Sequence, residues 1–256
     1  MGGTQIVLAA ERPPNLVTSL PEIASTDQFK NGWVYTDGVF MGVAPHWSGY
    51  IAAGYAPHLP QPQRDLLEAD FAALGIPMAL GATVEVEARM LRTLPLRDIP
   101  IARRMPWWSD WLNHWDNPEY FRDNDTSDRL RNVGVPILHF GGWYDFFLRN
   151  TYEHYKNIST HAKDPSVASS QRLLIGPWAH GESSCAACGA NATIDERALR
   201  MAWMDQWFKG KKASVFDYPV VLYVMGENRW RAEAGWPLLY GDRKSVVVGK
   251  ECRSRW

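Results

Sequence analysis

The fold of this chain is decided by the stretch VPILHFGGWYD, residues 135–145, an apolar strand-like run that stops at the carboxylate of Asp145. A second run, RLLI at residues 172–175, leads through a Gly-Pro-Trp-Ala turn to His180. Residues 147–158 between them have the spacing of a helix. The order is therefore strand, acid, helix, strand, histidine, which indicates an α/β arrangement.

That order matches the way an α/β-hydrolase delivers the last two members of a Ser…Asp…His triad. In such a triad the histidine takes the proton from the serine, and the aspartate orients the imidazole and stabilises its charged form. His180 and Asp145 are thus the candidate catalytic residues. Two plainer interpretations stay open: His180 as a hydrogen-bonded loop histidine, and Asp145 as the N-cap of the helix that follows.

Composition excludes several classes of protein. The chain has 256 residues, of which 46% are hydrophobic and 21% charged, as is typical of a globular protein of one or two domains. A net charge of −1 argues against a nucleic-acid partner, and no apolar run is long enough for a membrane span. No signal peptide is visible, so a cytoplasmic and a secreted location both stay open.

Tryptophan and cysteine are the two unusual residue types. There are thirteen tryptophans, which predict aromatic core packing or an aromatic-lined pocket. Trp108, Trp111 and Trp115 recur at helical spacing and predict one buried helix face. Cys185 and Cys188 lie in a small-residue loop after His180 and predict a thiol pair or a local disulfide. A zinc site is disfavoured because no second pair of ligands exists at suitable spacing.

The rest of the chain divides into segments of different character. Residues 1–25 begin with a helix pattern and continue into a short strand candidate. Residues 26–132 are rich in glycine, proline and aromatic residues, with helix patterns at 64–74, 82–91 and 107–115. Beyond the second strand, a helix is predicted from about Asp195 to Phe208. Residues 218–225 have a strong strand pattern that predicts the first strand of a following β domain.

Five segments taken together resemble one family. They are GGTQ (2–5), WLNHWDNPEY (111–120), VPILHFGGWYDFF (135–147), LIGPWAHG (174–181) and VLYVMGENRWRAEAGWPL (221–238). They are similar to the CocE/NonD serine hydrolases, the group of cocaine esterase, X-Pro dipeptidyl-peptidase, cephalosporin acylase and α-amino-acid ester hydrolase. The resemblance covers most of residues 1–240 in the right order.

The resemblance implies an α/β-hydrolase core that is partial, with its N-terminal strands missing. The core would comprise residues 1–25 and 133–213, with an inserted helical cap at 26–132 and the start of a C-terminal β jelly-roll domain at 214–241. Residues 242–256 do not resemble the family. They are interpreted as a non-native, adapter-like tail and excluded from the fold prediction.

The family's nucleophile elbow reads G-x-S-Y-x-G-x-T-Q, and residues 2–5 match its last four places. The serine would then lie two residues upstream of Met1, and no G-x-S-x-G occurs anywhere in the chain. Ser48 follows His46-Trp47 without the leading glycine of an elbow, so it is interpreted as a cap or loop serine. The chain is therefore expected to be a fragment truncated at both ends and to lack activity of its own.

The resemblance also implies a substrate pocket lined by Trp33, Trp47 and Phe147. Phe147 and Leu148 stand where α-amino-acid ester hydrolases place carboxylates for the substrate's ammonium group. Apolar side chains cannot pair an ammonium, so a substrate with a free α-amino group is disfavoured.

The predicted function is hydrolysis of a small-molecule ester or amide by a Ser-His-Asp acyl-enzyme mechanism, with neither cofactor nor metal. A homo-oligomer of the full-length parent stays open. An X-Pro dipeptidyl-peptidase-type hydrolase is the alternative within the same class. A non-catalytic, aromatic-rich binding module is the alternative from another class, and only the tryptophan content favours it.

Overall fold

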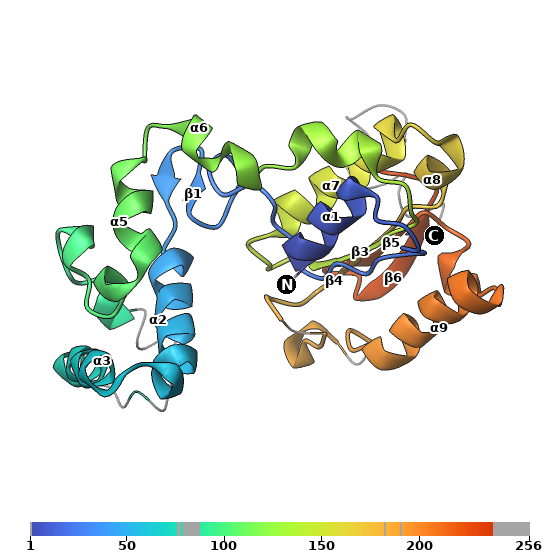
Figure 1. Cartoon of the computed structure of the whole chain (residues 1–256). Coiled ribbons are helices and arrows are strands. Elements are labelled where there is room, and N and C mark those ends of the chain that lie inside the picture. The colour runs from blue at the N-terminus through green and yellow to red at the C-terminus, as the bar shows by residue number, and fades with distance from the viewer. Residues whose placement is uncertain (1, 76–77, 79–87, 182, 190, 238–256) are drawn as a thin grey trace. The chain divides into compact units, whose positions relative to one another are not determined.

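The computed structural model describes residues 2–75, 78, 88–181, 183–189 and 191–237 (Figure 1). The chain forms two compact units: unit 1 combines Met1–Thr26 with Thr126–Trp256, and unit 2 is Asp27–Asp125. Most of the predicted helix at 82–91 and the whole predicted tail at 242–256 lie outside the described residues.

Unit 1 is a mixed sheet with helices on both faces. Its strands are β3 (Leu138–Gly142), β4 (Arg172–Gly176), β5 (Val220–Val224) and β6 (Arg229–Glu233). Its helices are α1 (Gly2–Glu11), α7 (Leu148–His161), α8 (Pro165–Ser169) and α9 (Glu196–Lys209), with 3-10 turns η6 (Ser127–Asn132), η7 (Ala186–Cys188) and η8 (Ser214–Phe216). The strand order is β3-β4-β5-β6; the first three are parallel, and β6 is antiparallel to β5.

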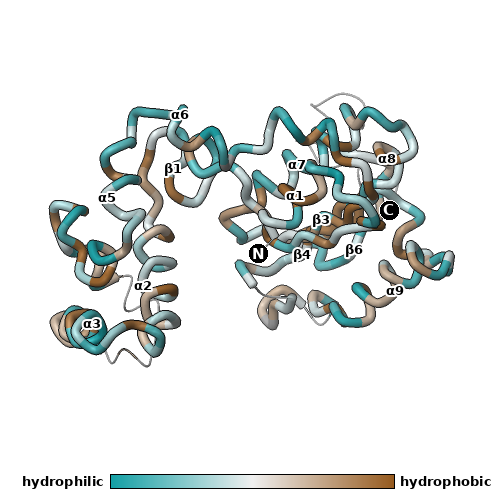
Figure 2. The backbone as a smooth tube through the Cα atoms, in the orientation of Figure 1, coloured by the Kyte–Doolittle hydropathy of each residue, from teal (hydrophilic) through white to brown (hydrophobic). Residues whose placement is uncertain are grey.

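The central strands are apolar on both faces because helices cover both. On one face Leu138, Phe140 and Leu174 pack against Trp203 of α9. On the other, Leu173 and Ile175 pack against Tyr155 of α7. Figure 1 shows α1 and α7 on one side of the sheet and α9 on the other, and Figure 2 shows hydrophobic residues gathered along the central strands. A strand buried on both faces has a continuous apolar run instead of an alternating one.

The strand predicted at 218–225 forms, but it does not open a separate β domain. Residues Val220–Val224 pair in parallel with β4, so β5 is the third strand of the sheet that holds β3 and β4. Within residues 214–241, predicted to start a jelly roll, β6 lies in the same sheet, next to β5. The apolar run of β5 suits a buried parallel strand, and strand pairing between distant segments is not encoded in the local pattern.

The segment after α1 runs beside β3 on its outer edge. Ser19 bridges Ile137 and Glu22 bridges Phe140, both in the parallel sense. Backbone hydrogen bonds join Leu138 N–H to the Ser19 carbonyl and Ile23 N–H to the Phe140 carbonyl, at 3.1 Å each. The predicted strand is thus present as isolated bridges, and proline, which lacks a backbone N–H, occupies position 21 between them.

Unit 2 contains helices and one short hairpin. Its elements are β1 (Tyr35–Thr36), β2 (Val39–Phe40), α2 (Val43–Tyr55), α3 (Gln61–Ala73), α5 (Pro106–Asn113) and α6 (Pro118–Phe121), with 3-10 turns η1 (Ala56–His58), η3 (Leu96–Asp98), η4 (Ala102–Arg104) and η5 (Arg122–Asn124). Asp70 of α3 is buried and accepts hydrogen bonds from Arg103, Arg104 and the Ile101 N–H. These bonds tie α3 to η4.

The helices predicted from periodicity are confirmed at α1, α3, α5, α7 and α9. Asp195 begins α9 by accepting a hydrogen bond from the Ala198 N–H at 2.9 Å, the usual role of an N-cap aspartate. On α5, Trp108 and Trp111 are buried as predicted, whereas Trp115 is 59% exposed. The helix ends at Asn113, so Trp115 does not continue the buried face.

Candidate active site

Asp145 is held in a turn between β3 and α7. The side chain is almost fully buried, and its Oδ1 accepts the Phe147 N–H at 2.6 Å. The backbone closes the turn, because Asp145 N–H bonds the Gly142 carbonyl and Leu148 N–H bonds the Asp145 carbonyl. The aspartate therefore shapes the entry to α7 with one oxygen and leaves Oδ2 for another partner.

His180 lies in a turn after β4, just as Asp145 lies in a turn after β3. The two turns meet at the carboxyl ends of these neighbouring parallel strands. Gly142 and Gly176 are paired in register, and the Tyr144 N–H bonds the Trp178 carbonyl at 3.1 Å. A side chain at position 142 would not fit, since a Cβ there would lie 2.1 Å from that carbonyl oxygen. Parallel pairing thus brings together two residues that are 35 positions apart in sequence.

Asp145 and His180 form a hydrogen-bonded pair. His180 Nδ1 lies 3.1 Å from Asp145 Oδ2, and the two side chains are 43% and 1% exposed. Phe146 stacks on the imidazole with ring centroids 4.3 Å apart, and Phe147 meets it edge-on at 5.3 Å. An ionised carboxylate only accepts hydrogen bonds, so this contact favours the tautomer with Nδ1–H toward Asp145, and the imidazole ring is partly exposed.

The predicted pocket residues lie in both units. Phe147 contacts His180 within unit 1. Trp33 and Trp47 lie against each other in unit 2, with centroids 4.6 Å apart, and Trp111 and Trp107 extend the cluster. Trp47 also lines a cavity of about 1120 Å³ between α2, α3 and the start of α5, whose walls are mostly apolar. A cavity of this size and lining suits an apolar or aryl group.

Three other residues with reactive side chains, Ser48, His139 and His154, are buried and make structural contacts. Ser48 is fully buried in α2 and accepts the Trp107 indole N–H at 3.3 Å, so it is not placed as a nucleophile. His139 is buried in β3, 3.1 Å from Gln171 Oε1. His154 is buried on α7, with its Nε2 2.8 Å from Thr26 Oγ1. Within the described part of the chain, no group of His, Cys, Asp or Glu side chains could hold a metal ion.

The two buried histidines make stability depend on pH. Desolvation by burial lowers the pKa of His139 to about 4 and that of His154 to about 3. From the unfolded pKa of 6.5 down to these values, the unfolded chain binds protons that the folded chain does not. The free energy of unfolding should therefore decrease as the pH is lowered, by about 1.4 kcal/mol per pH unit for each histidine.

Urea unfolding of wild type and His154→Gln at pH 5 and pH 6 measures this effect. The variant should show a smaller loss of stability between the two pH values, by about 1 kcal/mol. An equal loss in both proteins would contradict the assignment of His154 as a neutral core residue.

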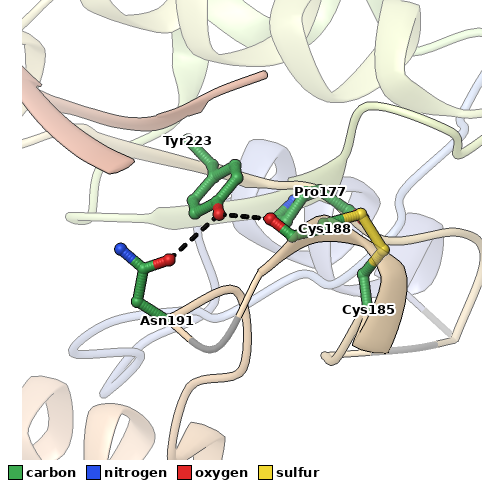
Figure 3. The surroundings of a disulfide bond; sticks show 5 residues. All are labelled: Pro177, Cys185, Cys188, Asn191 and Tyr223. Carbon is green, nitrogen blue, oxygen red and sulfur yellow. Dashed lines mark hydrogen bonds between the residues drawn. A yellow bond between two sulfur atoms is a disulfide. The ribbon is translucent and has the colours of Figure 1, made fainter. Parts of the chain in front are cut away.

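The loop after His180 contains a disulfide between Cys185 and Cys188 (Figure 3). This agrees with the predicted thiol pair or local disulfide. Tyr223 of β5, which is fully buried, donates its hydroxyl to the Cys188 carbonyl at 2.6 Å and lies 3.0 Å from Asn191 Oδ1. The loop is therefore attached to the neighbouring strand of the sheet.

The largely parallel sheet with helices on both faces has the α/β-hydrolase fold. The profile of the X-Pro dipeptidyl-peptidase (S15) family matches residues 1–182, so the chain belongs to that family of hydrolases. Cocaine esterase from Rhodococcus sp. (strain MB1 Bresler) is 28% identical over 250 residues. That match covers 93% of this chain but 41% of the relative, so the chain spans about two fifths of the relative's length.

Solved structures show the same fold at low sequence identity. An α-amino acid ester hydrolase is similar with a TM-score of 0.58 and 17% identity, over 92% of this chain and 37% of that one. An aminopeptidase from the marine sediment archaeon Thaumarchaeota archaeon has a TM-score of 0.61 and 16% identity, over 93% and 38%. A CocE/NonD family hydrolase from Staphylococcus aureus has a TM-score of 0.52 and 13% identity, over 92% and 33%.

Sequence reasoning missed three residues that shape this site. Phe146 stacks on the imidazole, Trp178 is buried between the two turns, and Tyr223 holds the loop after His180. Phe146 and Trp178 lie within the quoted motifs, so their positions were a usable signal. Tyr223 also lies within a quoted motif, but its contacts had no local signal, because its partners are more than thirty residues away.

Proposed function

We propose that the full-length protein hydrolyses ester or amide bonds of small molecules through a Ser-His-Asp acyl-enzyme mechanism. The observation that carries the proposal is the 3.1 Å hydrogen bond between His180 Nδ1 and the buried Asp145 Oδ2. Asp145 and His180 follow the carboxyl ends of neighbouring parallel strands, as the acid and histidine of α/β-hydrolase triads do. The family to which the chain belongs supports a hydrolase, and the binding-module alternative keeps only the tryptophan content in its favour.

In the proposed reaction, His180 Nε2 takes the serine proton while the serine Oγ bonds to the substrate's carbonyl carbon. The tetrahedral intermediate then collapses, and the leaving group departs with the proton from His180. Water attacks the acyl-enzyme, giving a proton to His180, and the serine oxygen recovers that proton as the acid is released. Asp145 keeps the ring oriented and stabilises the imidazolium in both halves of the reaction.

The nucleophile would come from a segment that precedes Met1, because residues 2–5 match only the end of the family's elbow. We call this longer polypeptide, the chain together with that segment, the extended protein. In this proposal residues 26–132 are the inserted cap of the hydrolase. Trp33 and Trp47 remain proposed substrate-binding residues on the strength of the family resemblance.

The proposed substrate class follows from Phe147 and Leu148, the second and third residues after Asp145. Phe147 contacts the imidazole ring, and Leu148 follows it at the first residue of α7. Neither can pair an ammonium group, so an acyl group that is apolar or aryl is favoured over an α-amino acyl group. An X-Pro dipeptidyl-peptidase activity is the second candidate, and the S15 family match is the observation that favours it.

Two chromogenic substrates separate these candidates. The extended protein should hydrolyse a p-nitrophenyl ester of an apolar acid and leave an X-Pro p-nitroanilide nearly untouched. Preference for the X-Pro anilide would instead favour X-Pro dipeptidyl-peptidase activity as the proposed function. Turnover of neither substrate above a variant with alanine at the elbow serine would overturn the proposed function.

The 256-residue chain itself is expected to be inactive, since its sequence contains no nucleophile elbow. Its rate on the p-nitrophenyl ester should equal that of its own His180→Ala variant, measured at equal concentration. A rate that exceeds this control would show that another residue in the chain serves as the nucleophile.

A further inference from the structure

Tyr223 contacts the supports of both turns at the candidate site. Its backbone carbonyl accepts the Trp143 indole N–H at 2.7 Å, and Trp143 stands two residues before Asp145. Its hydroxyl donates to the Cys188 carbonyl at 2.6 Å, eight residues after His180. One residue of β5 is thus bonded on one side to the aspartate turn. On the other side it is bonded to the histidine loop, as Figure 3 shows.

Cys188 also contacts the turn that leads to His180. Cys188 Sγ lies 3.4 Å from the carbonyl oxygen of Pro177, three residues before His180. The bond to Cys185 closes the loop into a small ring, inside which the Cys188 N–H bonds the Cys185 carbonyl at 3.0 Å. Cys188 is buried, so its sulfur is enclosed between Pro177 and the loop backbone.

The far end of the loop is held by the same strands. Asn191 Oδ1 lies 3.0 Å from the Tyr223 hydroxyl, and the Asn191 carbonyl accepts the Trp230 indole N–H of β6 at 2.8 Å. The loop that follows His180 is therefore bonded to two adjacent strands, and both groups of bonds depend on side chains. Removing the Tyr223 hydroxyl would leave a buried carbonyl without its donor, which is costly for the loop in this position.

We propose that Tyr223 is a positioning residue for the Asp145–His180 pair, acting on His180 through Cys188 and the Cys185–Cys188 disulfide. This inference rests on the proposed function. Positioning of a general base affects the reacting geometry more than substrate binding, because small displacements of a catalytic group cost rate. Tyr223→Phe in the extended protein should therefore lower kcat about tenfold while KM changes by less than about twofold.

Reduction of the disulfide tests the same connection without a substitution. A dithiol reductant attacks the more exposed Cys185 sulfur, Cys188 departs as a thiolate and takes a proton, and the reductant closes to a cyclic disulfide. Two electrons and two protons pass from reductant to protein. Reduction should lower kcat as Tyr223→Phe does, should add little to that variant, and reoxidation should restore the rate.

Matched controls separate positioning from general damage. Tyr218→Phe removes a hydroxyl from an exposed tyrosine just before the same strand and should leave kcat unchanged. Cys185→Ser/Cys188→Ser should make kcat insensitive to the reductant. A kcat of Tyr223→Phe and of the reduced protein equal to wild type, with ester hydrolysis intact, would overturn the proposal while leaving the proposed function standing.

Hydrogen exchange in the 256-residue chain tests the connection between Tyr223 and the His180 turn independently of catalysis. Backbone amides of residues 178–181 should exchange faster after Tyr223→Phe and after reduction, while those of α7 stay unchanged. Unchanged exchange at 178–181 in both samples would overturn the proposal even if the extended protein proved to have no hydrolase activity. If the variant does not fold, the reduced wild-type chain still decides the result.

Discussion

Replacing Asp145 by asparagine in the extended protein should lower kcat by about 10⁴-fold, with little change in KM. Asparagine can still accept the Phe147 N–H through its amide oxygen, so the turn before α7 should persist. Its amide neither holds the imidazole in the Nδ1–H tautomer nor stabilises the imidazolium. His180 therefore no longer acts efficiently as the general base. The measurement is kcat on a p-nitrophenyl ester at neutral pH.

Asp164→Asn is the matched control for that substitution. Asp164 also precedes a helix and accepts a backbone N–H, from Ser166 at 2.8 Å, and it lies outside the candidate pair. Its kcat should equal that of wild type. Full activity in Asp145→Asn, with circular dichroism and melting unchanged, would show that this aspartate serves only the turn before α7.

Trp178→Ala should destabilise unit 1 by about 3–5 kcal/mol, the range for removing a buried aromatic side chain. The ring is 1% exposed, stacks on Phe140 with centroids 5.4 Å apart, and packs on Trp230. It fills the space above Gly176, where a Cβ would lie 2.0 Å from the indole. Urea unfolding followed by circular dichroism measures the loss.

Two further variants test the cause of that loss. Trp115→Ala removes an exposed tryptophan and should change the free energy of unfolding by less than about 0.5 kcal/mol. Gly176→Ala should destabilise the wild type by overpacking, and the same substitution should cost much less in a Trp178→Ala background. Additive effects of the two substitutions would contradict the packing of this ring over the glycine.

Local patterns predicted most of the helices and the two strands that carry the candidate pair. The helices at α3, α5, α7 and α9 follow from apolar spacing that repeats within the segment itself. The parallel strands follow from apolar runs between turns, and their polar ends are where such sheets place functional groups. The quoted motifs, read together, were sufficient to indicate the family.

Long-range packing decided what those patterns left open. Strand β5 pairs with β4 within unit 1, although its sequence was equally compatible with a separate β domain. His154 is buried because α7 turns that face toward Thr26, and a helix pattern cannot say which neighbour a polar side chain will meet. In the described part of the chain, the short strand predicted within residues 1–25 pairs with β3 through bridges at Ser19 and Glu22.

The sequence by itself determined that an acid and a histidine end successive strands of an α/β-hydrolase, because strand, turn and helix patterns are short-range. Only the tertiary structure decided that Asp145 and His180 meet at 3.1 Å and that Tyr223 reaches both turns. These contacts join segments from different strands. Their geometry depends on register, on glycines at close approaches and on buried aromatic packing, and none of these is a property of one segment.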